Sequence, residues 1–309
     1  MSVTDTQNAY DFDADVLRDK YRAERDKRVR DDGNDQYLEV KGDFSHYVDD
    51  PYVEKGFDRD ALTEELEVLV IGGGFGGMLA AARLIEQGIT DIKIIEKGGG
   101  FGGTWYWNRY PGASCDIESY VYLPMLEETG FVPRQKYTDA PETLAYCQVL
   151  AEKFGLNDLA LMQTEVVSTV WDETTRRWTV TTNRQDNLKA RYVVHSNGPL
   201  NRPKLPAIKG IGDYKGHTFH TSRWDYDYTG GNSHGGLDKL ADKRIAIIGT
   251  GATAVQCVPH LGAGAKELFV FQRTPSSISV RNNQPTDPDW LGTQKSGWQN
   301  ERRTNFESL

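Results

Sequence analysis

The hydrophobic pattern predicts a strand–turn–helix–strand unit in the first third of the chain. Residues 66–71 (LEVLVI) form an apolar run of strand length, and the Gly-rich segment GGGFGG begins directly after it. Residues 75–87, rich in Ala and Leu, have the composition of a helix that ends at Gly88, and 91–96 (DIKIIE) is a second predicted buried strand. This order of elements predicts a βαβ unit.

The same order of patterns returns about 177 positions later, measured from Gly72 to Gly249. An apolar run at 243–248 precedes the Gly-rich segment GTGATA, a helical pattern at 252–261 and a further apolar run at 267–271. A repeat at this distance duplicates a whole structural unit and excludes a short-period repeat protein. The chain therefore carries two predicted βαβ units.

The pattern changes between the two units. Residues 141–154 start with Pro and are followed by Gly155, an asymmetry that is typical of a helix. Residues 164–172, 177–182 and 188–196 have strand composition, with Asn and Asp turns between them. We expect these three strands to form a small antiparallel meander.

The first Gly-rich turn has the spacing of a dinucleotide-binding motif. It reads Gly72-x-Gly74-x-x-Gly77, and such glycines permit a tight turn and a close approach of backbone N–H groups to a pyrophosphate. Glu96 stands 22 positions after Gly74, where an acidic side chain binds the ribose 2′-OH of an unphosphorylated adenosine. These features predict that the first site binds FAD.

The second turn reads Gly249-x-Gly251-x-x-Ala254, and Ala is a known variant at the third position. Arg273 stands 22 positions after Gly251. An Arg cannot accept a hydrogen bond from a ribose hydroxyl, but it can bind a 2′-phosphate with two charged hydrogen bonds. The second site therefore predicts NADPH, and the alternative is an Arg that merely ends an exposed strand. The predicted NADP-binding residues are Gly249, Thr250, Gly251, Ala254, Arg273 and Thr274.

The predicted fold class is α/β, with two Rossmann-like dinucleotide-binding domains, the small antiparallel meander, and both domains incomplete. We expect an N-terminal extension at 1–64, an FAD-binding domain at 65–205, a linker at 206–230 and an NADP-binding domain at 231–309. Within the extension, the charged residues 15–30 predict a solvated surface helix.

Composition narrows the possible partners and the compartment. With 36 Lys and Arg against 45 Asp and Glu, the net charge of −9 disfavours binding to nucleic acid. Cys115, Cys147 and Cys257 are widely spaced, which favours a reducing compartment without structural disulfides. The polar start is unlike a signal peptide, and the most apolar run is broken by five glycines. We expect a cytoplasmic protein with no membrane partner.

A segment after the first unit resembles the first fingerprint of the type I Baeyer–Villiger monooxygenases, the class B flavoprotein monooxygenases. It contains the residues 102–105 (GGTW), 109–112 (RYPG) and Asp116. Disulfide reductases need a cysteine pair at this place, and only Cys115 is present. The resemblance implies FAD contacts from Gly103, Thr104, Trp105, Arg109, Tyr110, Asp116 and Tyr122. The aromatic residues Trp105, Tyr106, Trp107 and Tyr110 would line the isoalloxazine or, alternatively, form core.

The segment YKGHTFHTSRWDY resembles the second fingerprint of this family, FxGxxxHxxxW(P/D). Gly216, His220 and Trp224 match, and Tyr214 replaces the usual Phe. The resemblance implies a linker in which His220 and Trp224 couple the two domains. Direct acid–base chemistry by His220 and a merely packed linker stay open, whereas a metal site lacks further ligands beside His217 and His220.

The resemblance implies an enzyme in which NADPH reduces FAD and O2 forms a C4a-peroxyflavin that converts a ketone into an ester or lactone. Asp116 would lie beside the flavin and pair with an Arg, or would alternatively cap the helix that follows. In the family that Arg lies far downstream, so we expect it beyond Leu309 and expect this chain to be an N-terminal portion. The alternatives are an N- or S-oxygenating flavin monooxygenase and a catalytically inactive fragment. The sequence indicates neither the ketone nor the oligomeric state.

Overall fold

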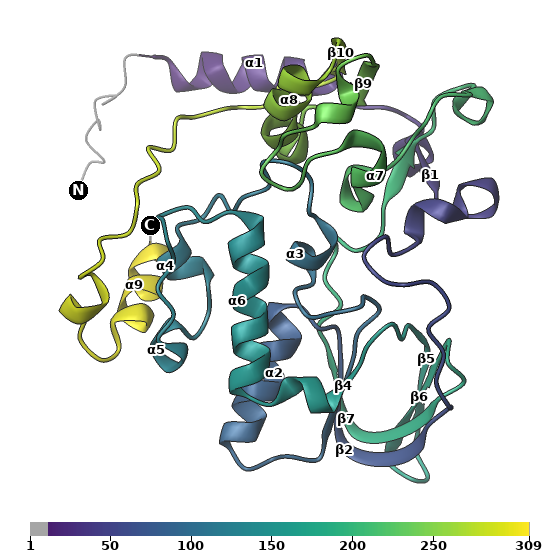
Figure 1. Cartoon of the computed structure of the whole chain (residues 1–309), viewed down its shortest axis with the longest axis vertical. Helices are drawn as coiled ribbons and strands as arrows, with labels where there is room; N and C mark the ends of the chain where they lie inside the picture. Colours follow the sequence, from purple (N-terminus) through teal and green to yellow (C-terminus); the bar gives the residue numbers. More distant parts are fainter. Residues whose placement is uncertain (1–11, 309) are drawn as a thin grey trace, which may run out of the picture.

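The computed structural model describes residues 12–308. Its larger unit contains a six-stranded sheet in the order β4-β3-β2-β7-β6-β5 (Figure 1). The strands are β2 (Thr63–Ile71), β3 (Ile92–Ile95), β4 (Ala160–Leu161), β5 (Val166–Asp172), β6 (Arg177–Thr182) and β7 (Asn187–His195). The predicted first βαβ unit and the predicted strands of the meander are confirmed.

The central strand β2 explains why the sheet holds together. It pairs in parallel with β3 on one side and with β7 on the other, with Val70 opposite Ile94 and Val194. Val68, Leu69 and Val70 are at most 3% exposed, because both faces of this strand are covered. The strands β5, β6 and β7 pair antiparallel as expected. However, β7 also joins β2, so the meander extends the main sheet and is not a separate layer.

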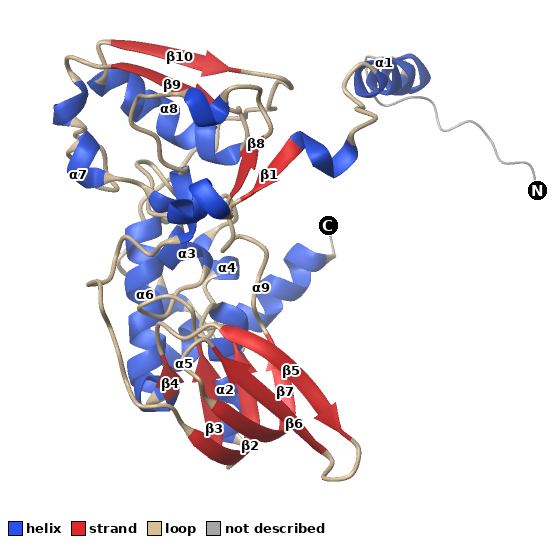
Figure 2. Cartoon of the chain, turned by 90° about the vertical axis from the view of Figure 1, so that its right-hand side faces the viewer, coloured by secondary structure: helices blue, strands red, loops and turns tan. Residues whose placement is uncertain are grey.

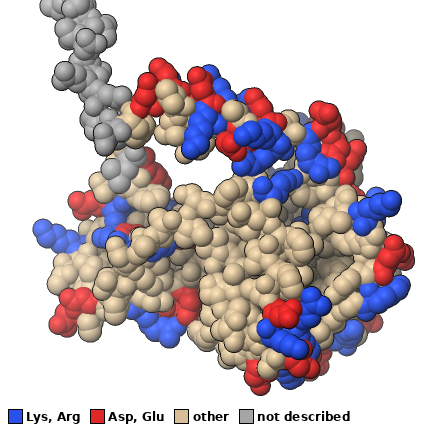
Figure 3. Space-filling view, turned by 90° about the horizontal axis from the view of Figure 1, so that it is seen from above, with Lys and Arg blue, Asp and Glu red and all other residues tan. Residues whose placement is uncertain are grey.

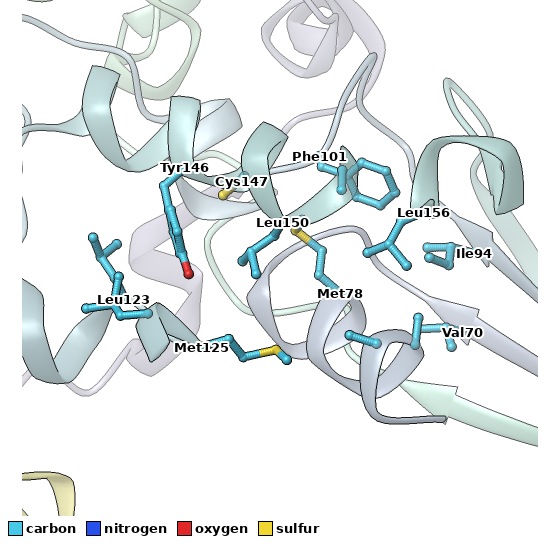
Figure 4. Close-up of a cluster of buried hydrophobic side chains, with 14 of the residues drawn as sticks. Val70, Met78, Ile94, Phe101, Leu123, Met125, Tyr146, Cys147, Leu150 and Leu156 are labelled. Carbon is cyan, nitrogen blue, oxygen red and sulfur yellow. The ribbon is translucent and has the colours of Figure 1, made fainter. Parts of the chain in front are cut away.

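Helix α2 (Phe75–Glu86) packs on this sheet, and α6 (Ala140–Lys153) packs against α2. The helix α6 begins where predicted, because the Asp139 side chain accepts a hydrogen bond from the N–H of Glu142 and Pro141 occupies the first turn. Figure 4 shows the main hydrophobic core between them, where side chains of the sheet, α2 and α6 meet. Its members include Val70, Met78, Ile94, Phe101, Leu123, Met125, Tyr146, Cys147, Leu150 and Leu156.

The second unit is smaller and lies at the opposite end of the molecule from the six-stranded sheet (Figure 2). It consists of β9 (Arg244–Ile248), α8 (Ala252–Gly264) and β10 (Glu267–Phe271), and the two strands pair in parallel. These are the elements predicted for the second βαβ unit, and the α/β fold with two Rossmann-type units is confirmed.

Short elements lie between the two units in the sequence. They are α3 (Thr104–Trp107), α4 (Ser119–Tyr122), α5 (Leu126–Thr129), β8 (Lys204–Pro206) and α7 (Tyr226–Thr229). After β10 the chain returns to the larger unit, where α9 (Trp298–Glu307) packs against α4. The buried amide of Gln299 accepts from the N–H of Leu126 and donates to the carbonyls of Tyr120 and Leu123. The predicted boundary at 230/231 stays a prediction.

The N-terminal extension contains α1 (Ala14–Asp26) and β1 (Tyr37–Glu39). No residue of α1 is buried, and acidic and basic side chains are interspersed along it (Figure 3). The strand β1, in contrast, pairs antiparallel with β8, with Leu38 opposite Leu205. No helix in the described part of the chain is both long and apolar enough to cross a membrane.

A buried ion pair fastens the extension to the sheet. The carboxylate of Asp186 is fully buried and accepts two hydrogen bonds from the Arg59 guanidinium, at 2.6 and 2.7 Å. It also accepts hydrogen bonds from Thr182 Oγ1 and from the N–H of Leu62. Burial raises the pKa of Asp186, but these hydrogen bonds outweigh burial and hold the pKa at about 2.

We predict that Asp186→Asn lowers the free energy of unfolding by about 3 kcal/mol at pH 7, because it leaves Arg59 without its counter-charge. The pKa of Asp186 is lower in the folded chain than its ordinary value of 3.8, so its contribution is complete above pH 4 and is lost toward pH 2. Urea unfolding should therefore show that the difference in unfolding free energy between wild type and variant becomes smaller as the pH falls from 4 to 2. The exposed Asp242→Asn serves as the control, and a difference that is constant with pH contradicts the prediction.

Candidate functional site

A cavity of about 520 Å3 opens at the carboxyl ends of β2, β3 and β7. After β2 the chain continues to β3 on one side, and β7 later joins on the other side. Such a reversal of strand order creates a crevice, which is where open α/β sheets bind ligands. Of the residues predicted to bind FAD, the cavity wall contains Gly72, Gly74, Glu96, Gly103, Thr104, Trp105 and Tyr122.

The Gly-rich turn is packed too tightly for larger residues. At Gly72, with φ of +109°, a Cβ atom would lie 2.4 Å from the carbonyl oxygen of Ser196. At Gly77, which lies within α2 behind the turn, a Cβ atom would lie 1.8 Å from the carbonyl oxygen of Gly72. The helix α2 thus starts directly at the cavity. Its N-cap is Gly74, which has no side chain to satisfy the first N–H groups of the helix.

Glu96 closes one side of the cavity. It directly follows β3 and is only 6% exposed. Its two carboxylate oxygens accept hydrogen bonds from the N–H groups of Gly73 and Gly98, each at 2.6 Å. Burial raises the pKa of Glu96, and the two N–H groups act in the opposite direction. The side chain therefore ties the Gly-rich turn to the next loop while it lines the cavity.

The aromatic side chains of the first fingerprint do not all line the cavity. Trp105 and Trp107 line the cavity, and Trp105 Nε1–H donates to the hydroxyl of Tyr122 at 2.9 Å. Tyr106 faces the N-terminal extension instead, where its hydroxyl donates to Asp50 at 2.7 Å. Tyr110 packs against the second unit. The structure thus brings only Trp105 and Trp107 of this set to the cavity.

Arg109 lies outside this cavity and lines a neighbouring one of about 580 Å3. Its guanidinium stacks on the rings of Tyr52 and Tyr106, at 3.9 and 4.5 Å from the ring centroids. Such cation–π contacts hold the side chain against the extension. Trp105 lines both cavities and separates them.

Asp116 is exposed and does not line either cavity. Its carboxylate lies 3.4 Å from Arg281 Nη2, and its carbonyl oxygen accepts a hydrogen bond from the same guanidinium. Asp116 is not a helix cap, because the residue before α4 is Glu118. Arg281, which follows β10, is a partner that the sequence motifs did not indicate.

The second predicted site assembles around the start of α8. Gly251 is its N-cap and, like Gly74, leaves the first N–H groups without a side-chain acceptor. Thr250 Oγ1 donates to the carbonyl oxygen of Thr274 at 2.9 Å, which brings the Gly-rich turn next to the segment after β10. Arg273 is exposed in this segment. Ala254, on α8, is buried in a cluster shared with residues of the first unit.

The two sites are joined by a shared hydrophobic cluster. Trp105, Tyr110 and Trp224 pack together with Cys257 and Leu261 of α8. The hydroxyl of Tyr110 donates to Gln256 Oε1 at 2.8 Å, and Gln256 Nε2 donates to the carbonyl of Ser114 at 2.9 Å. The first fingerprint therefore forms the interface with the second unit.

The second fingerprint lies in the linker, away from the cavity walls. His220 Nδ1 accepts from the N–H of Ser222 at 3.2 Å and so caps a short helical turn. Burial and then the positive charge of Arg223 lower the pKa of His220 to about 4. Trp224 is buried, with Nε1–H donating to Thr229 Oγ1, and Gly216 lies against the Tyr214 ring.

The neighbouring histidine, His217, pairs with Asp225 at 2.8 Å and stacks on Tyr228. Among residues 12–308, no three His, Cys, Asp or Glu side chains lie together as a metal site requires. All three cysteines lie in this part of the chain and are buried free thiols.

Arg223 is a buried residue that the sequence analysis missed. Its guanidinium stacks on the Trp107 ring at 3.8 Å. It donates to the carbonyls of Asp49, Ser222 and Asn201, at 3.1, 2.9 and 3.0 Å. Arg223 thus joins the extension, the cavity wall and the linker. It occupies a variable position of the fingerprint, so no motif pointed to it.

The chain matches a known protein family. Residues 69–286 match the family model described as pyridine nucleotide-disulphide oxidoreductase. The chain belongs to this family. The matched range contains both Rossmann-type units, and its three cysteines are free thiols.

Individual relatives in this family are monooxygenases. A Baeyer–Villiger monooxygenase of Streptomyces coelicolor is 52% identical over 290 residues, which cover 94% of this chain and 48% of the relative. The solved polycyclic ketone monooxygenase of Thermothelomyces thermophila is 41% identical, with a TM-score of 0.89, and covers 95% of this chain and 50% of that one. The solved OTEMO complex with FAD and NADP is 35% identical, with a TM-score of 0.68, over 78% and 44%.

The chain spans about half the length of the curated relatives it matches. The resemblance to Baeyer–Villiger monooxygenases, predicted from the two fingerprints, is confirmed by these members of the family. The oxygenating enzymes of the N- and S-type are not favoured, because the relatives act on ketones by name or carry the Baeyer–Villiger name.

We predict that His220 makes the stability of the linker depend on mildly acidic pH. The pKa of His220 is lower in the folded chain than its ordinary value of 6.5, so its contribution is complete above pH 6.5 and is lost toward pH 4. The difference between these two pKa values corresponds to roughly 3 kcal/mol in the free energy of unfolding. The variant His220→Gln keeps an acceptor for Ser222 but cannot be protonated.

Unfolding measured between pH 7 and pH 4 should show a smaller loss of stability for His220→Gln than for wild type. His234→Gln, at an exposed histidine, provides the matched control and should behave like wild type. Identical pH profiles of His220→Gln and wild type would show that the burial of His220 has no energetic consequence.

Proposed function

We propose that this chain binds FAD and NADPH as part of a Baeyer–Villiger monooxygenase, which inserts one oxygen atom of O2 next to a ketone carbonyl and yields an ester or lactone. The observation that carries the proposal is the pair of uncapped helix starts at Gly74 and Gly251, each with a predicted selectivity residue. In support, relatives of the chain are named as monooxygenases of ketones.

The residues of the first site fit FAD. The cavity is lined by residues from the Gly-rich turn, from the end of β7 and from β5. The N–H groups at the start of α2 would hold the pyrophosphate, since anions bind at helix N-termini. The buried carboxylate of Glu96 would accept from the adenosine ribose. Trp105 and Trp107 would cover the cavity and exclude water from the bound ring system.

The residues of the second site fit NADPH. The N–H groups at the start of α8 would hold its pyrophosphate, and Arg273 would bind the 2′-phosphate. Bound FAD supplies the oxygen chemistry and bound NADPH supplies the reducing hydride. The task of the chain is then to hold both groups in a fixed relation, which the cluster of Tyr110 and Trp224 with α8 achieves.

The remaining assignments follow the same proposal. His220 acts in domain coupling and not in proton transfer to substrate, because it is partly buried, has its pKa lowered to about 4 and is absent from both cavity walls. The role of Asp116, in the first fingerprint, beside the flavin stays a prediction, because its exposed side chain lines neither cavity. The cytoplasmic location keeps its support from three free thiols.

Arg273→Ala tests the coenzyme assignment. We expect the Kd of NADP+ to rise about tenfold to hundredfold, because a charged hydrogen bond to phosphate contributes ~1.5–3 kcal/mol. The Kd of NAD+, which has no 2′-phosphate, should stay nearly constant. Calorimetric titration of both coenzymes decides the matter, and equal losses for the two would refute the assignment.

Glu96→Gln tests the flavin assignment. The variant keeps the shape of the side chain but replaces one carboxylate oxygen with an NH2 group, which can accept neither from the ribose nor from the N–H of Gly73 or Gly98. This loss should raise the Kd of FAD about fivefold to tenfold. Quenching of flavin fluorescence on titration with the apoprotein measures this Kd. Glu165→Gln is the matched control, because Glu165 also lines the cavity but pairs with Lys97. An unchanged Kd in Glu96→Gln would remove the residue from the flavin site.

A further inference from the structure

The N-terminal extension reaches the residue that is predicted to select the coenzyme. Arg273 Nη1 donates a hydrogen bond to Gln36 Oε1 at 2.5 Å, although the two residues are 237 positions apart in the sequence. Gln36 in turn donates from Nε2 to the carbonyl of Gly33, also at 2.5 Å. Its amide is therefore oriented with the oxygen toward the guanidinium.

The position of Gln36 is fixed by the fold and does not depend on this contact alone. Its carbonyl accepts a hydrogen bond from the N–H of Ala207 at 2.9 Å, which continues the ladder of β1 and β8. Directly after β1, Val40 and Tyr47 are buried against Leu205 in a small hydrophobic cluster. The extension is thus anchored at Gln36 itself and in the residues that follow it.

The chemistry of Gln36 suits a neighbour of a phosphate-binding Arg. An amide oxygen accepts one of the five N–H groups of a guanidinium and leaves the other four. Because the amide is neutral, it orients Arg273 without cancelling the charge that a phosphate needs. A carboxylate in this place would instead form an ion pair and compete with the phosphate for the same guanidinium.

We propose that Gln36 is a specificity-determining residue of the coenzyme site, which holds Arg273 in position for the 2′-phosphate of NADPH. The inference rests on the proposed function, namely that Arg273 binds this phosphate. It assigns a role in coenzyme selection to an extension that the sequence pattern describes only as a charged surface segment.

The test compares the Kd of NADP+ and NAD+ for three variants of the full chain by calorimetry. Gln36→Glu should weaken NADP+ about tenfold to hundredfold and leave NAD+ within about twofold. Gln36→Ala should weaken NADP+ less, by about threefold to tenfold, because the guanidinium keeps its charge but loses its orientation. Asn34→Asp adds the same negative charge two residues away and should leave the ratio of the two Kd values near that of wild type.

The outcomes separate the inference from the proposed function. If Arg273→Ala lowers the preference for NADP+ but Gln36→Glu does not, the role of Gln36 is wrong and the coenzyme site stands. If neither variant changes the preference, the assigned coenzyme site is itself wrong. An equal loss in Asn34→Asp and Gln36→Glu would mean that any nearby charge suffices, which also overturns a specific role. Unaltered thermal unfolding of the variants without coenzyme excludes misfolding as the cause.

Discussion

The packing of the first fingerprint against helix α8 is the interaction on which the arrangement of the two sites depends. Tyr110 and Trp224 are buried among α8 side chains, and Gln256 bridges Tyr110 and Ser114 by two hydrogen bonds. The same fingerprint places Trp105 in the wall of the Gly-rich cavity. One short segment therefore shapes the first site and also fixes its distance from the second, so a change at this interface acts on both.

The N-terminal extension adds a second constraint from outside the two units. It is bound to the sheet by Arg59 and Asp186, to the linker by Arg223, and to the second unit by Gln36. Arg223 is the most connected of these residues, because it holds three carbonyl oxygens of separate segments and also stacks on Trp107. Burial lowers the pKa of the Arg223 guanidinium, and the nearby charge of Asp50 acts in the opposite direction. The carbonyl hydrogen bonds reduce the cost of desolvation.

Local sequence signals predicted the elements well, because these elements depend on neighbours in the chain. The buried runs of β2 and β3, the turn at Gly72 and the capped start of α6 each carry their own pattern. The double role of β7 could not be predicted, since its pairing with β2 depends on a partner about 120 positions away. The contacts of the predicted extension were missed for the same reason: those of Arg59, Arg223 and Gln36 join distant segments and have no local pattern. Likewise, the fingerprint identified its aromatic residues but not that Tyr106 and Tyr110 face away from the cavity.

The chemical nature of the contacts between the units determines how the assembly responds to its surroundings. Tyr110–Gln256, Gln256–Ser114 and the hydrogen bond from the Gly112 N–H to the Ser233 carbonyl, at 2.9 Å, are all between neutral groups. Neutral hydrogen bonds within an apolar cluster are little affected by salt, which screens exposed charges far more strongly. The relation of the two sites should thus be insensitive to ionic strength. Charged side chains take part where the extension meets the units, at Arg59, Arg223 and Arg273, and in the exposed pair of Asp116 and Arg281. Changes in ionic strength therefore act more on these contacts than on the neutral interface.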